Sequence, residues 1–152
     1  MNQKSTIFWE TYWKEKSESA PADASVSDWA FGADSDHLLD LVLQGKKTAT
    51  CSGHLFYEKE QEPLPRSGQY AVILNSDEEP KAIIEITHVD VMPMNEVPEA
   101  FAKAEGEGDL SYDYWYKAHE EFFTEELKPY GLEFKEDMLL VCERFKLVYS
   151  AS

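Results

Sequence analysis

The sequence has few basic residues for its length. Of its 152 residues, 14 are lysine or arginine and 30 are aspartate or glutamate, so the formal net charge is −16. Proteins that hold long nucleic acids usually carry a basic face, and this charge therefore argues against long duplex DNA or long RNA as a main partner. A local basic pocket that reads a single nucleotide is still compatible with it.

Cysteine is also scarce, and long apolar runs are missing. Cys51 and Cys142 are too few and too far apart to form a disulfide framework, and segment 1–16 does not read as a secretory leader. We therefore expect reduced thiols, a cytoplasmic location and no membrane partner. The four histidines and two cysteines make no metal-ligand pattern, so we predict no metal and no cofactor.

What is present predicts one folded domain, since 43% of residues are hydrophobic and 13% are aromatic. Residues 5–16 carry aromatic side chains at helical spacing and predict a helix whose aromatic face is core or a docking surface. A polar connector follows over residues 17–28. We expect residues 1–27 to pack onto a domain formed by residues 28–150.

The periodicity and the turn residues predict the remaining elements. The predicted helices cover 36–44, 98–104 and 112–126, and the predicted strands cover 48–52, 69–74, 81–91 and 138–149. Most connections are too short for parallel crossovers, which favours an α+β protein built on a small antiparallel or mixed β-barrel covered by helices. No glycine-rich phosphate turn follows the first strand, so a Rossmann sheet does not fit.

The segment Gly45-Lys46-Lys47-Thr48-Ala49-Thr50 is a basic turn between a helix that Gly45 can end and a strand. A partly desolvated lysine with a lowered pKa can take the proton of a threonine hydroxyl, so Lys47 and Thr50 are candidates for base and nucleophile. Lys46 is either a solvated charge or a phosphate contact. A plain solvated turn is the alternative for the whole segment.

Glu85 lies mid-strand between isoleucines, where a carboxylate needs either solvent or a partner, and Lys47 is the candidate partner. The alternatives are a structural salt bridge or a solubility charge on an edge strand. Glu143 and Asp90 occupy comparable strand positions, and Glu143 serves as the control for the choice of Glu85.

Trp115 and His119 lie one helical turn apart and could stack on a planar base and hydrogen-bond to it, although an aromatic core stripe with a satisfied histidine is the simpler explanation for a single helix. His54 follows the basic turn and is a further candidate for substrate binding. These residues complete the set of predicted binding side chains.

Taken together, Gly45, Lys47 and Thr50 in Gly-x-Lys-x-x-Thr, Leu64-Pro65 with Gly68 to Leu74, Ile83-Ile84-Glu85 and the run from Glu105 to Phe123 resemble the ASCH domain family, which is related to PUA domains. The resemblance covers about residues 28–149. It implies a PUA-like β-barrel with a cleft lined by the basic turn, and a role in RNA metabolism.

Some small bacterial members of that family resemble amidohydrolases that remove the acetyl group from acetylated cytidine, and others are linked to RNA cleavage. The resemblance implies Lys47 as general base, Thr50 as nucleophile and Glu85 as the positioning carboxylate. The ligand would be a nucleoside or an RNA fragment. The alternatives are a binding module for RNA or a nucleotide without catalysis, and a protein-interaction domain that forms a homodimer through the N-terminal aromatic helix.

Overall fold

The computed structural model describes residues 1–151, and its strands form one mixed sheet in the order β1-β3-β4-β5-β2. The pairing of β1 with β3 is parallel, and the other neighbouring pairs are antiparallel. The strands are β1 (Val26–Trp29), β2 (Ala49–Gly53), β3 (Tyr70–Leu74), β4 (Pro80–Pro93) and β5 (Leu139–Ser150). The predicted α+β class with a mixed sheet is confirmed.

The predicted barrel is not seen as a closed structure. The sheet begins at β1 and ends at β2, and these two edge strands do not pair with each other within residues 1–151. The long strands β4 and β5 pair along most of their length, with register shifts between Ile83 and Ile84 and between Ile86 and His88. Such bulges bend a strand, so the sheet curves without the closure that the resemblance implied.

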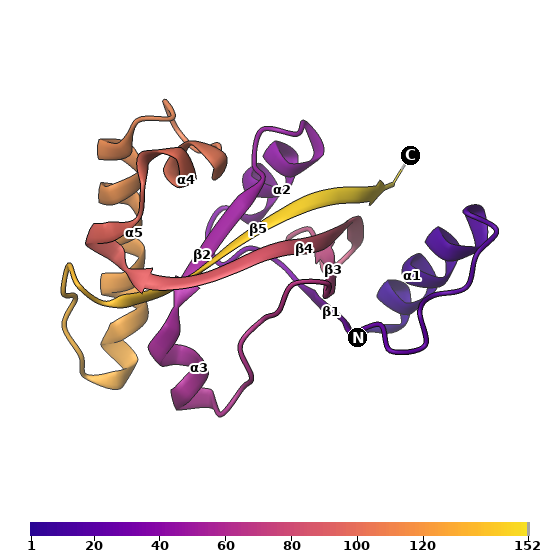
Figure 1. Ribbon diagram of the computed structural model, residues 1–152, viewed down its shortest axis with the longest axis horizontal. Helices are drawn as coiled ribbons and strands as arrows, with labels where there is room; N and C mark the ends of the chain where they lie inside the picture. Colours follow the sequence, from indigo (N-terminus) through magenta and orange to yellow (C-terminus); the bar gives the residue numbers. More distant parts are fainter. Residues whose placement is uncertain (152) are drawn as a thin grey trace.

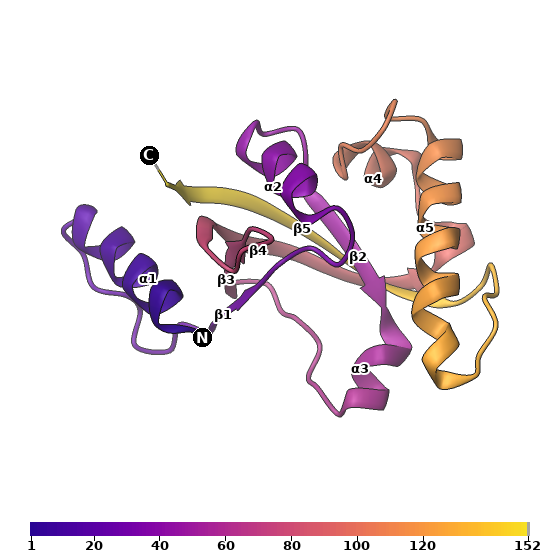
Figure 2. The ribbon, with the colours of Figure 1, turned by 180° about the vertical axis from the view of Figure 1, so that it is seen from behind.

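Helices lie at both ends of the sheet, with α1 at one end and α4 and α5 at the other (Figure 1). The same arrangement seen from behind places α2 over the sheet between them (Figure 2). The helices are α1 (Gln3–Glu15), α2 (Ser35–Leu43), α3 (His54–Glu60), α4 (Glu99–Ala104) and α5 (Tyr112–Leu127), with short 3₁₀ turns at Met94–Glu96 and Lys128–Tyr130. No helix of the described residues is long and apolar enough to cross a membrane.

The aromatic face of α1 belongs to the core. Trp9, Tyr12 and Trp13 are buried against Val72 and Ile83 of the sheet. The helix begins at Asn2, whose side chain accepts a hydrogen bond from the Ser5 amide at 2.7 Å and so caps the first turn. A homodimer through this face would require α1 to leave the sheet, and the homodimer stays a prediction.

Two further groups of buried side chains position the functional site. The first packs α2 on β3, β4 and β5, and includes Val42 and Phe145. The second packs α4 and α5 on β2 and β5, and includes Phe101, Trp115 and Cys142. The turn that joins α2 to β2 therefore runs between these two groups.

Candidate functional site

The basic turn directs Lys47 into the protein. Gly45 has a φ of 76° and ends α2 in the left-handed conformation that glycine adopts without strain, as predicted. The amides of Lys46 and Lys47 then both donate to the carbonyl of Leu41, at 2.9 and 3.1 Å. This geometry leaves Lys46 in solvent, whereas only 1% of the Lys47 side chain is exposed.

The buried Lys47 ammonium is held by two carboxylates. Its Nζ lies 3.2 Å from Glu105 Oε1 and 3.0 Å from Glu107 Oε2, and it also donates to the Glu105 carbonyl at 3.4 Å. An ammonium group has three donors, so these contacts engage all of them. Phe31 lies beneath the charge, with its ring centre 5.4 Å from Nζ.

These partners decide the protonation state of Lys47. Burial alone would lower the pKa of its ammonium group, but the charges and hydrogen bonds of Glu105 and Glu107 outweigh burial and raise that pKa above its ordinary value. The predicted lowering of the lysine pKa is therefore wrong in direction. Lys47 is a charged ammonium group in this site.

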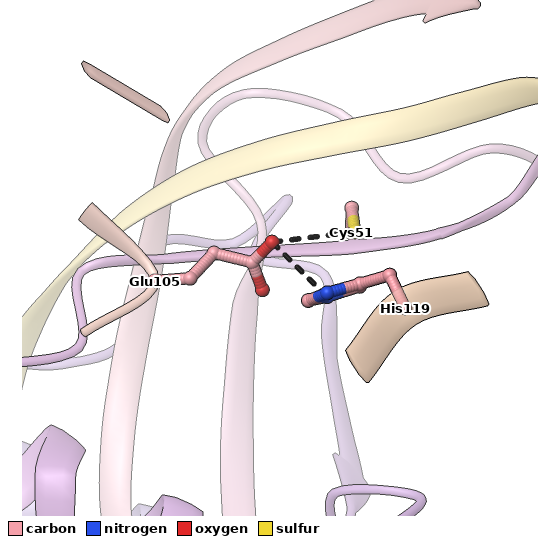
Figure 3. A group of neighbouring side chains, drawn as sticks. All are labelled: Cys51, Glu105 and His119. Atoms are coloured by element: carbon pink, nitrogen blue, oxygen red, sulfur yellow. Dashed lines mark hydrogen bonds and ion pairs between the residues drawn. The ribbon is translucent and has the colours of Figure 1, made fainter. Parts of the chain in front are cut away.

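Glu105 is the centre of a buried network (Figure 3). Its Oε2 lies 3.3 Å from Nε2 of His119, accepts from Cys51 Sγ at 3.4 Å, and accepts a short hydrogen bond from the Trp115 indole. Burial would raise the pKa of the Glu105 carboxyl, yet Lys47, His119 and the indole lower it to about 2. Glu105 is therefore ionised at neutral pH.

The charge on Glu105 also sets the state of its neighbours. Burial opposes charge on His119, but Glu105 and the bond of Nδ1 to the Trp115 carbonyl at 2.7 Å raise the imidazole pKa. With both ring nitrogens engaged in this way, the charged imidazolium is favoured. Burial and the nearby carboxylate raise the pKa of the Cys51 thiol well above its ordinary value, so Cys51 stays protonated.

The ligand atoms of Cys51, Glu105 and His119 lie within 4.8 Å of one another, which is a spacing that metal sites share. Metal binding needs a thiolate and a neutral imidazole, whereas here the thiol is protonated and the imidazole is held in its charged form. Glu105 already accepts from Lys47, Trp115 and Cys51. The group therefore fits an ion-pair network better than a metal-ligand set.

Gly106 brings the two carboxylates to Lys47. Its φ is 73°, and a Cβ atom at this position would lie 2.3 Å from the carbonyl oxygen of Lys46. Only glycine allows the loop after α4 to approach the basic turn this closely. The residues on either side of it, Glu105 and Glu107, are thereby placed on the ammonium group.

Thr50 stands where two cavities meet. A hollow of about 250 Å³ is lined by Lys47, Thr50, Glu105, Glu107 and His119, among others. A neighbouring groove of about 740 Å³ runs along the sheet toward α3 and the loop before β3. The hollow and the groove adjoin, since both are lined by Phe31, Gly32, Thr50, Cys51 and Phe122.

The groove contains a second buried carboxyl group. Glu143 of β5 is the direct cross-strand partner of Thr50, and 8% of it is exposed. Burial raises the pKa of its carboxyl to about 7. The sequence had suggested Glu143 only as a control for Glu85.

The predicted contact between Lys47 and Glu85 is wrong. Glu85 lies 3.4 Å from Lys146 and lines a separate surface hollow beside α1 together with Tyr12 and Tyr70. It shares a sheet face with Ile83, which packs against α1, whereas Lys47 lies toward α4 and α5. The sequence pattern correctly indicates that the Glu85 carboxylate needs solvent or a partner, but that partner is Lys146 on the neighbouring strand β5.

The structure places some of the predicted binding residues at the hollow and others away from it. His119 lines the hollow, and Trp115 lies stacked on it with ring centres 4.6 Å apart, buried behind the hollow. His54 is the first residue of α3 and pairs with Glu58 at 3.3 Å. Neither His54 nor the exposed Lys46 is among the residues that line the hollow or the groove.

Comparison with known proteins agrees with this architecture. The family model of the ASCH domain matches residues 27–149. The chain belongs to the ASCH domain family. No protein of curated function matches it.

Two solved structures are similar over nearly the full length of this ASCH protein. The ASCH domain from Lactobacillus crispatus JV V101 is 40% identical, with a TM-score of 0.89, and the match covers 98% of this chain and 96% of that one. A protein from Enterococcus faecalis V583 is 43% identical, with a TM-score of 0.83, over 97% of this chain and 90% of that one. Both matches extend beyond residues 27–149 and so include the α1 region.

The ASCH motif residues Lys47 and Thr50 were found from sequence, whereas the roles of Glu105, Glu107 and Glu143 were missed. The sequence presents Glu105 and Glu107 only as part of the Glu105 to Phe123 run that carries the family resemblance. Its signal was the glycine between two acids, which permits a close approach to another backbone. No local sequence signal marks Glu143. Its burial depends on distant segments that line the groove over β5, namely α3, the loop after α3 and the segment before α2.

Proposed function

We propose that this ASCH protein is an amidohydrolase that removes the acyl group from an N-acylated, cytidine-like nucleoside, with Thr50 as nucleophile. One observation carries the proposal: Thr50 lines the same hollow as the buried Lys47. The hollow and the adjoining groove, about 250 and 740 Å³, together are large enough for a nucleoside.

In this proposal Lys47 stabilises negative charge. Its pKa is raised by Glu105 and Glu107, so it suits the developing oxyanion better than it suits the role of proton acceptor. Glu107 lies on a loop and 19% of its side chain is exposed, compared with 1% for Glu105. A substrate carbonyl oxygen can therefore take the place of the Glu107 carboxylate on the ammonium, while Glu105 keeps Lys47 in position.

The class of substrate follows from the walls of the site and from the net charge. Phe31, His119 and Phe122 line the hollow, and aromatic side chains suit a planar ligand. A formal charge of −16 repels a long polyanion but has little effect on an uncharged nucleoside. The proposed substrate is therefore a free nucleoside or a short RNA fragment that carries an acylated base.

The test is to incubate the protein with a panel of N-acylated nucleosides and to follow release of the carboxylic acid. We expect the wild type to release acetate from N-acetylcytidine and Thr50→Ala to lose at least about 100-fold in kcat, because the nucleophile is gone. Thr11→Ala, on the outer side of α1, is the matched control and should keep wild-type activity. Full activity in Thr50→Ala would remove the proposal.

A second function, binding without catalysis, is favoured by one specific observation: all three donors of Lys47 are already engaged. A binding module would hold the nucleoside with similar affinity in the wild type and in Thr50→Ala, and would release no acid. Calorimetric titration of both proteins with N-acetylcytidine separates the two functions. The protein-interaction alternative loses the surface on which it was based, since the aromatic face of α1 is buried.

A further inference from the structure

The proposed reaction needs a group that takes the proton from Thr50, and the groove offers one. Thr50 of β2 and Glu143 of β5 are direct partners in antiparallel register. Directly opposed residues in such a pair project their side chains on the same face of the sheet, with Cα atoms about 4.5–5.5 Å apart. Both side chains line the groove, so the hydroxyl and the carboxyl face one shared space.

The surroundings of Glu143 are unusual for a strand carboxylate. Within residues 1–151, no lysine, arginine or histidine nitrogen lies within 4.0 Å of its carboxyl oxygens, whereas Glu85 has Lys146 and Glu105 has Lys47. A buried carboxyl without a cation is costly to ionise, and burial holds the Glu143 pKa near 7. Such a group can accept and return a proton at neutral pH, which is what an acid–base catalyst requires.

We propose that Glu143 is the general base that activates Thr50 and the acid that protonates the leaving nitrogen, with Lys47 remaining an ammonium group throughout. This assignment rests on the proposed amidohydrolase function and deepens it. It also places the two parts of the substrate: the acyl oxygen toward Lys47 in the hollow, and the nucleobase in the groove.

Glu143 takes part in four proton transfers during one catalytic cycle. Glu143 carboxylate takes the hydroxyl proton of Thr50 as Oγ bonds to the acyl carbon and the carbonyl pair moves onto oxygen. The carbon–nitrogen bond then breaks, and the nitrogen takes the proton from Glu143. Water next attacks the Thr50 ester and gives a proton to Glu143, and Oγ recovers that proton as the carboxylic acid leaves. The net reaction is amide plus water to acid plus amine.

The groove fits the leaving base. It is lined by both apolar and hydrogen-bonding residues, and Tyr57 and Ser52 are joined by a hydroxyl hydrogen bond of 2.9 Å. The other side chains of the groove that suit a planar ring or its polar edge are Trp29, Leu64, Pro65, Gln69 and Tyr70.

Other ionisable groups surround Glu143 and must be separated from it in a pH experiment. The groups that line the groove are Tyr57 of α3, Glu62, Tyr70 of β3 and Glu126 of α5, and on the strands beside it are His88, Asp90 and Arg144. In the hollow, His119 has a raised pKa and also titrates above its ordinary value. His119 is therefore the competing explanation for any ionisation near neutral pH.

The experiment is the pH profile of N-acetylcytidine hydrolysis for wild type, Glu143→Gln and Glu143→Ala. We expect wild-type kcat to rise with pH through an ionisation near 7, as a base must be deprotonated, and Glu143→Gln to lose about 100-fold or more in kcat with little change in KM. The residual rate of Glu143→Gln should lack that ionisation. Added formate should restore part of the activity of Glu143→Ala, which a purely structural role would not allow.

The matched control is Asp90→Asn, an exposed strand acid near Glu143 that lines neither cavity and should keep wild-type kcat. Wild-type kcat in Glu143→Gln would overturn the role of Glu143 but leave the proposed function standing. Survival of the ionisation near 7 in that variant would do the same and would assign the ionisation to His119. Loss of kcat in a variant with an unchanged circular dichroism spectrum supports the role of Glu143. A wild type that releases no acid from any member of the panel would overturn the proposed function, and the role of Glu143 with it.

Discussion

At the scale of single residues, the site consists of two carboxyl groups in opposite electrostatic situations. Glu105 is surrounded by donors and cations, which lower its pKa to about 2, whereas burial without a cationic partner raises the pKa of Glu143 to about 7. Thr50 lines the hollow together with Glu105 and the groove together with Glu143. Their different surroundings give the two carboxyl groups different behaviour at neutral pH. Glu105 stays ionised and holds Lys47, whereas Glu143 can accept and release a proton.

Removing the charge of Glu105 should destabilise the protein. In Glu105→Gln the Lys47 ammonium stays buried without its main partner, and we expect a loss of about 3–5 kcal/mol in unfolding free energy at pH 7. Because the pKa of Glu105 is lowered on folding, its contribution is complete above the ordinary value of 4.5 and is lost as pH falls from 4.5 toward 2. Urea unfolding between pH 2 and 7 should therefore show the wild type approaching the variant in acid.

Glu99→Gln is the matched control for that measurement. Glu99 pairs with Lys103 at 3.7 Å, and more than half of both side chains is exposed, so the expected change is within about 0.5 kcal/mol. Equal stability of Glu105→Gln and wild type at pH 7 would contradict the assignment of Glu105 as the charge that holds Lys47.

At the scale of elements, the helix α1 is part of the core rather than an appendage. Its aromatic side chains pack on β3 and β4, and Tyr12 and Phe8 contact Tyr149 of β5 with ring centres 5.2 and 5.1 Å apart. α1 thereby packs on the sheet face that carries Ile83 and Glu85. α4 and α5 lie at the other end of the sheet (Figure 1), and residues of α5 and of the loop after α4 line the functional site.

Truncating the α1 face should be costly. Trp13 is 7% exposed, and Trp13→Ala should lower the unfolding free energy by about 3–5 kcal/mol through lost burial and the cavity that remains. Ile7→Ala on the same helix is the control, because Ile7 is 55% exposed and its removal should change stability by about 0.5 kcal/mol at most. Chemical denaturation of both variants and of the wild type measures the two changes in unfolding free energy. Similar effects of the two substitutions would show that α1 is not packed as described.

The sequence predicted most elements because each has a regular apolar pattern, but β1 and α3 were missed. β1 is four residues long within a run of small residues, and its pairing comes from β3, more than forty positions later. None of the α3 residues is buried, so α3 has no apolar stripe to recognise. Lys47 and Thr50 could be found because the motif is local. Their carboxyl neighbours could not, because the choice among Glu85, Glu105 and Glu143 depends on which sheet face and which loop meet.

At the scale of the whole molecule, a strongly acidic protein holds the buried Lys47 ammonium group beside a cavity. The net charge of −16 disfavours long RNA, and the volumes of the hollow and groove favour a ligand of nucleoside size. In the fold, α1 packs on the sheet away from the hollow, which lies between β2, α5 and the loops around them.

The central claim is that Thr50 becomes acylated during turnover. The most direct measurement is mass spectrometry of the wild type quenched during hydrolysis of N-acetylcytidine, followed by peptide mapping. The account predicts an acetyl group on the peptide that contains Thr50 in the wild type, and no such adduct in Thr50→Ala. Acid release by an enzyme whose Thr50 peptide stays unmodified, or an acetyl group found on another side chain, would contradict it.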